Sequence, residues 1–224
     1  MNTGAPGFFG KVTSHGDFVS RRLPPALVEA WDVWLQQCIH CSKQQLGAEW
    51  LAYYLTSPIW RFAVASGVLD ALPWSGVLMP SVDRVGRHFP LMIAAPGSPG
   101  VALTEYVSGG MAWFDRLEDL ARDTLAADFV LEQFDQALAV IPIQQTGAIM
   151  GDAVAGWRLP LSAPGGVPSG LAQLLQQGHS LWWTGGSPNV APSLLACRGM
   201  PAPPSFAAML DAGWQARGWC TPPA

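Results

Sequence analysis

The sequence has few charged residues. Asp, Glu, Lys and Arg together make up 12% of its 224 residues, about half of the share of roughly 25% found in an average soluble protein. Disordered chains combine high charge with low hydrophobicity, so this composition, with 50% hydrophobic residues, excludes that class. The length is sufficient to bury a sizeable core, and the low charge favours an apolar surface that a partner covers.

Basic clusters and long apolar segments are also missing. The net charge is −4 and there is no basic run, which excludes a nucleic-acid-binding domain because such a domain must neutralise phosphates. The N-terminus, Met1–Gly10, has neither the basic nor the apolar region of a signal peptide. The longest nearly uncharged stretch, Phe62–Val82, contains Asp70 and Pro73, which interrupt a membrane helix. We therefore expect a cytoplasmic protein with no integral membrane span and no nucleic-acid partner.

Four cysteines are too few for a disulfide scaffold in a chain of this length. Cys38 and Cys41 have a C-x-x-C spacing, but a zinc site needs four ligands, and Cys197 and Cys220 are isolated. The pair also lies within a strong helical pattern, so we interpret both residues as buried helix cysteines. We expect no metal and no cofactor.

No established catalytic motif is present. The sequence has no P-loop, no G-x-G-x-x-G after a strand, no G-x-S-x-G and no H-E-x-x-H. A Ser-His-Asp set can be assembled only from neighbours on turns, namely Ser14 or Ser81, His15 or His88, and Asp17 or Asp83. Adjacent side chains on one turn do not face one another well enough for a proton relay. A non-enzymatic binding protein is therefore the leading interpretation, and a small hydrolase that uses the Ser81–His88 loop is the alternative.

Strands and helices are mixed along the whole chain. Apolar runs with Gly/Pro boundaries predict strands over 8–12, 60–64, 76–79, 89–95, 180–184 and 193–197. Helical periodicity predicts helices over 25–47, 50–55 and 203–211, a further helix after Gly110, and another after the N-cap candidate Asp128. The segment 141–170 is rich in Gly, Pro and Ala and is predicted to be loop. Hairpin-length connections in the middle favour a partly antiparallel sheet. We expect one α/β or α+β domain over 1–224, with helices packed on a mixed, partly antiparallel sheet.

Two polar segments, Ser14–Phe18 and Ser81–Phe89, stand out in this charge-poor chain. In one interpretation Asp17 and Asp83 anchor turns through backbone amides or through arginines. In the other, the arginines of the second segment present donor forks to a partner. A third candidate surface is the acidic face of the helix after Gly110, formed by Asp115, Glu118, Asp119 and Asp123.

These segments make the sequence resemble the TagF (ImpM) family of type VI secretion-associated proteins. The matching stretches are 7–11, 14–19, 22–24, 31–35, 54–62, 76–91 (GVLMPSVDRVGRHFPL), 180–183 and 185–186. The resemblance is close over the first hundred residues, which carry the family motifs, and loose over 101–224, where we expect helices and the remaining strands. His15 departs from the family pattern, in which a basic residue such as arginine is more frequent. A histidine there would make any charged contact at this position pH-dependent.

The resemblance implies a function. Proteins of this bacterial family are post-translational repressors of type VI secretion and act through protein–protein interaction, with the forkhead-associated scaffold of the system as the implied partner. Some relatives carry a fused phosphatase domain, which we do not expect here. We single out as partner-binding or motif positions Ser14, Gly16, Asp17, Trp60, Arg61, Ser81, Asp83, Arg84 and Arg87.

Overall fold

The computed structural model describes residues 4–99, 101–143, 157–160 and 178–220. A single eight-stranded sheet forms its centre, in the order β2-β1-β5-β4-β3-β7-β8-β6. The strands are β1 (Gly7–Gly10), β2 (Val19–Arg21), β3 (Trp60–Val64), β4 (Trp74–Met79), β5 (Leu91–Pro96), β6 (Trp157–Pro160), β7 (His179–Thr184) and β8 (Ser193–Arg198). Every pairing among these strands is antiparallel. The predicted α+β class, with helices packed on a sheet, is confirmed, but the described sheet is antiparallel throughout rather than mixed.

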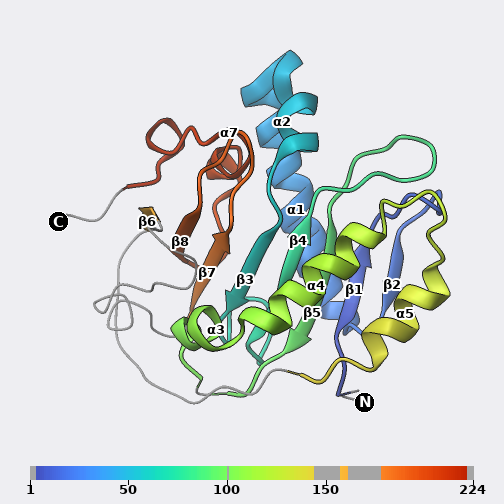
Figure 1. Cartoon of the computed structure of the whole chain (residues 1–224). Coiled ribbons are helices and arrows are strands. Elements are labelled where there is room, and N and C mark those ends of the chain that lie inside the picture. The colour runs from blue at the N-terminus through green and yellow to red at the C-terminus, as the bar shows by residue number, and fades with distance from the viewer. Residues whose placement is uncertain (1–3, 100, 144–156, 161–177, 221–224) are drawn as a thin grey trace.

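Helices cover both faces of this sheet (Figure 1). On one face lie α1 (Pro25–Leu46), α2 (Trp50–Thr56) and α7 (Ala208–Asp211), and on the other α3 (Leu103–Gly109), α4 (Met111–Asp123) and α5 (Leu131–Ala139). Alternate residues of each central strand face the two cores: Leu78 and Met92 pack toward α1, while Val77 and Ile93 pack toward α4. A strand buried on both faces has no solvent side, which is why β5 is an uninterrupted apolar run and why β3 and β4 are apolar except for the buried Arg61 and Ser75.

The structure differs from the sequence prediction in several elements. It adds β2, α3 and β6, the last of which lies inside the segment 141–170 that was predicted to be loop; most of that segment lies outside the described residues. The predicted N-cap Asp128 is wrong, because α5 follows Val130 and has no side-chain cap. The predicted terminal helix is split into a 3-10 turn, Pro203–Ser205, and the short α7. No helix among the described residues has the length and apolar character that a membrane span requires.

An aromatic cluster joins α1 to the sheet. Trp31 is fully buried, and its ring centroid lies 4.9 Å from that of Phe62 on β3 and 6.0 Å from that of Trp182 on β7. Trp34 lies beside it and donates a hydrogen bond of 2.8 Å from Nε1 to the carbonyl of Pro201. The high tryptophan content of this chain therefore serves largely to pack one core.

Replacement of Trp31 tests this packing. We expect Trp31→Ala to lower the free energy of unfolding by about 3–5 kcal/mol, because the cavity left between helix and sheet cannot be refilled. The matched control is Val33→Ala on the same helix, where the side chain is 52% exposed; it should change stability by less than about 0.5 kcal/mol. Chemical denaturation followed by fluorescence measures both, and equal losses in the two variants would contradict the assignment.

Candidate functional site

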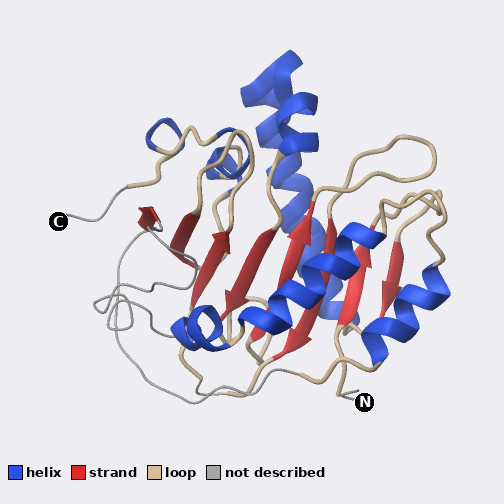
Figure 2. Cartoon of the chain, in the orientation of Figure 1, coloured by secondary structure: helices blue, strands red, loops and turns tan. Residues whose placement is uncertain are grey.

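Two polar loops meet at one end of the sheet. Residues 11–18 connect β1 to β2, and residues 80–90 connect β4 to β5, so both loops leave the sheet where the paired strands β1 and β5 have their common end. The β4–β5 loop extends beyond that end of the sheet in Figures 1 and 2. The backbone N–H of Arg84 donates to the carbonyl of His15 (2.9 Å), and the Ser81 hydroxyl donates to the carbonyl of Lys11 (2.8 Å). We call residues 11–18 and 81–89 the loop junction.

Asp83 is the centre of the loop junction. Its side chain is completely buried, and its carboxylate accepts hydrogen bonds from Lys11 Nζ (2.6 Å), Arg87 Nε (2.7 Å) and the backbone N–H groups of Arg87 (2.9 Å) and Val85 (3.0 Å). Burial alone would raise the pKa of Asp83, but these hydrogen bonds from Lys11, Arg87 and Val85 outweigh it and hold the pKa well below its ordinary value. Asp83 therefore anchors the turn through backbone amides and an arginine, as predicted, and through Lys11 as well.

Lys11 and Gly10 bring the two loops into contact. Gly10 has a φ of +148°, and a Cβ there would lie 2.3 Å from the carbonyl oxygen of Pro90, so only glycine allows this approach. Lys11, almost buried, then lies with Nζ 4.5 Å from the ring centroid of Phe18. Sequence reasoning missed Lys11 as the partner of Asp83, although a lysine in the apolar run that opens the chain is itself a signal that a carboxylate lies nearby.

Asp17 does not behave like Asp83. Its side chain is fully exposed, and its ion-pair contact is with the Nη2 of Arg87 at 3.8 Å. The expected pairing of Asp17 with an arginine is present, but it is made from an exposed position, and the same Arg87 Nη2 also donates a hydrogen bond to the carbonyl of Gly16. Ser14 lies next to His15, with 2.8 Å between its Oγ and the ring Nδ1.

The groups that a hydrolase would need in the Ser81–His88 loop are held apart. The hydroxyl of Ser81 donates to the Lys11 carbonyl. The Tyr54 hydroxyl donates to the Ser81 carbonyl at 2.8 Å and accepts from the Ser81 backbone N–H at 3.0 Å. His88 packs edge-on against Trp50 and Tyr54 instead, at centroid distances of 5.9 and 5.6 Å. With the Asp83 carboxylate already occupied, these contacts leave the loop without a nucleophile–base pair.

Trp60 and Arg61 lie next to one another on β3, with their side chains on opposite faces of the sheet. Trp60 donates from Nε1 to the carbonyl of Met209 at 3.1 Å. Arg61 is buried against α4, with Nε 2.6 Å from Glu118 and Nη2 2.6 Å from Asp115. Arg61 is therefore not one of the arginines that anchor Asp83, and these two motif positions fasten helices to the sheet.

The same ion pairs change the interpretation of the acidic face of α4. Asp115 and Glu118 bind Arg61, while Glu118 and Asp119 bind Arg122. Three of the four carboxylates predicted for this face are thus paired within the chain, with two arginines between them, which weakens the case for a docking surface there.

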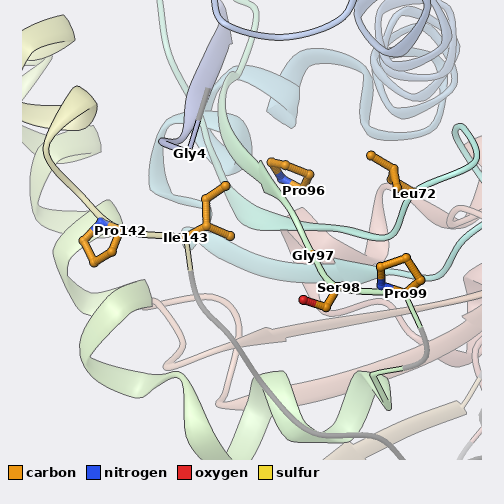
Figure 3. A pocket seen from close by; sticks show the side chains of 8 residues that line it. All are labelled: Gly4, Leu72, Pro96, Gly97, Ser98, Pro99, Pro142 and Ile143. Carbon is orange, nitrogen blue, oxygen red and sulfur yellow. The ribbon is translucent and has the colours of Figure 1, made fainter. Parts of the chain in front are cut away.

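The remaining candidate sites offer little chemistry. Cys38 is buried as predicted, whereas Cys41 is only partly buried, and burial together with the neighbouring Cys41 raises the pKa of the Cys38 thiol. The described part of the chain holds no group of three or more His, Cys, Asp or Glu side chains placed for a metal ion. A pocket of about 540 Å³ lies at the opposite end of β5 from the loop junction (Figure 3). Its lining includes Leu72, Pro96 and Ile143, with Ser98 as its one polar side chain among the described residues.

A sheet covered by helices on both faces, with two polar loops joined at one end, defines the class of fold as an α+β domain. The comparisons assign the family: a sequence model of the TagF N-terminal domain, type VI secretion system-associated, matches residues 7–141, more than half of the chain. The chain belongs to this family, and the predicted resemblance is confirmed.

A solved structure extends the likeness beyond that region. The crystal structure of PA0076 from Pseudomonas aeruginosa PAO1 is 37% identical, with a TM-score of 0.82, and the match covers 98% of each chain. A comparison with curated proteins finds no match. The similarity therefore includes β7 and β8, which extend the sheet beyond β3.

Removal of the Asp83 charge tests its structural role. We expect Asp83→Asn to lower the melting temperature at pH 7 by several degrees, because Lys11 is left buried without its carboxylate. Since the folded-state pKa is lowered, the stabilisation is complete above the unfolded pKa of about 3.9 and is lost as the pH falls below it. The difference in melting temperature between wild type and Asp83→Asn should therefore shrink below about pH 4.

Asp17→Asn is the control for that measurement, because it removes the same charge from the exposed side of the loop junction. Its melting temperature should stay close to that of the wild type. A gap between wild type and Asp83→Asn that is equally large at pH 3 and pH 7 would contradict the electrostatic account.

The buried ion pair of Arg61 gives a further prediction. Arg61→Met should cost about 3–5 kcal/mol of unfolding free energy, because the buried Glu118 loses one of its two arginine partners and Asp115 loses its own. The double variant Arg61→Met/Glu118→Leu should recover part of this loss, as apolar replacements of a buried pair usually do. Arg116→Met, at an exposed position of α4, is the control. If the double variant is less stable than the single one, the ion pair is not the cause.

Proposed function

We propose that this protein is a non-enzymatic, cytoplasmic repressor of type VI secretion that acts after translation, by stoichiometric binding to a component of the secretion apparatus. The observation that carries the proposal is membership of a type VI secretion-associated family over residues 7–141. The partner that we favour is the forkhead-associated scaffold protein of the system.

The state of the polar residues supports binding over catalysis. The hydroxyl of Ser81 and the carboxylate of Asp83 are used in contacts between loops, and Arg61 is used in a contact between sheet and helix. An enzyme keeps such groups open to a substrate, whereas a binding protein uses them to hold a surface in shape. The loop junction is the surface that these contacts hold.

We also propose that the chain acts as one unit. The family region ends at residue 141, yet β3 within it pairs with β7 outside it, from Arg61 opposite Trp183 to Val64 opposite Ser180. Trp34 and Trp60 each donate a hydrogen bond to the backbone of the C-terminal segment. Removal of residues after 141 would expose the edge of β3 and part of both cores, so the functional unit includes both parts.

Titration in a secreting cell tests the function. Overproduction of the wild type should lower the amount of secreted substrate in the medium, and joint overproduction of the scaffold protein should restore it, because a binder is exhausted by its target. The purified pair should co-elute in a single complex. Repression by amounts far below that of the scaffold would indicate a catalyst, and unchanged secretion together with no complex would contradict the proposal.

The variant Ser14→Ala separates the two classes further. Within the loop junction, Ser14 Oγ lies 2.8 Å from His15 Nδ1, so a hydrolase that used Ser14 as its nucleophile would lose activity completely in this variant. A binding protein should retain repression in this variant, since only one half-buried hydroxyl is lost.

A further inference from the structure

Apolar and cationic side chains are exposed together at the tip of the loop junction. Val85 is 65% exposed and Phe18 is 46% exposed. Arg84, next to Val85, is exposed and takes part in none of the ion pairs of the described residues. Its guanidinium lies 3.8 Å from the position that a Cβ on Gly16 would occupy, so it lies beside the loop that carries Phe18.

These exposed residues are held in place by the buried ones. The amide of Val85 is bound to the Asp83 carboxylate, and the amide of Gly86 donates to the Asp83 carbonyl at 3.0 Å. Phe18 stacks on Phe9 at 5.4 Å and packs edge-on against Phe89 at 4.8 Å. A surface that is already ordered loses little conformational entropy on binding, which favours affinity.

We propose that Phe18, Arg84 and Val85, which we call the tip, form the contact with the protein partner, and that the partner presents an apolar pocket rimmed by carboxylates. This inference rests on the proposed function and names the chemistry of its binding surface. Aromatic residues and arginine dominate the energetics of protein interfaces, particularly beside apolar contacts that exclude water. The motif residues Ser81 and Asp83 then act as positioning residues behind the tip.

Charge complementarity indicates which groups line the pocket of the partner protein. The charges of the loop junction other than Arg84 compensate one another: Lys11 binds Asp83, and Arg87 lies between Asp83 and Asp17. Arg84 is left as the cation without a partner, so a carboxylate on the bound protein complements it. A second copy of this chain fits less well, because a symmetric contact centred on the tip places the two Arg84 side chains near one another.

Equilibrium binding to the purified forkhead-associated scaffold protein tests whether the tip makes the contact with the partner. Val85→Ser and Arg84→Glu should each raise the Kd about tenfold or more, the first because apolar area is no longer buried on binding and the second because a carboxylate then faces the carboxylates of the partner. The matched controls are Val33→Ser and Arg116→Glu, which make the same changes at exposed positions of α1 and α4 and should leave the Kd within about twofold. Circular dichroism of every variant checks that each is folded.

The outcomes separate the two proposals. If the wild type does not bind the scaffold, both the proposed function and this inference fail. If the wild type binds and neither tip variant weakens binding more than its control, the inference alone is overturned. The Kd of the wild type should also rise with salt more steeply than that of Arg84→Glu, and equal salt slopes would exclude the carboxylate rim. Dimerisation of the free chain that Val85→Ser abolishes would make the tip a self-contact instead.

Discussion

The Asp83 carboxylate binds groups from two loops that are far apart in the sequence, and the shape of one end of the molecule depends on it. Lys11 reaches it from the loop after β1, and Arg87 with two backbone amides reaches it from the loop before β5. A buried carboxylate of this kind is stable only if all its partners are in place. The exposed side chains around it therefore take one arrangement, which a partner can recognise.

The sheet supplies the frame on which that end is built. Because helices cover both faces, the central strands carry almost no surface, and the loops at the strand ends are left to present side chains to other molecules. Arg61 fastens α4 to one face and the aromatic cluster around Trp31 fastens α1 to the other. The family motifs thus divide into residues that hold the frame and residues that shape the loop junction.

Much of this could be predicted from the sequence, and the exceptions have physical causes. The long apolar runs of β3 and β5 and the helical period of α1 are strong local signals, and each was placed to within a few residues. The strand β2 has only three residues, two of them exposed, so its formation depends on pairing with β1 rather than on its own pattern. At the loop junction Asp83 could be predicted as an anchor because a carboxylate between apolar strands needs partners. Its partner Lys11 and the exposure of Asp17 depend on how two distant loops meet, which no local pattern encodes.

The central claim is that the loop junction carries the contact with the secretion apparatus. Hydroxyl-radical footprinting of the chain, alone and with the purified scaffold protein, measures the exposure of individual side chains. The account predicts that Phe18 and Val85 become less reactive in the complex, while the exposed Val33 on α1 and Val140 after α5 stay unchanged. Unchanged reactivity of Phe18 and Val85 in a complex that protects other residues would contradict it.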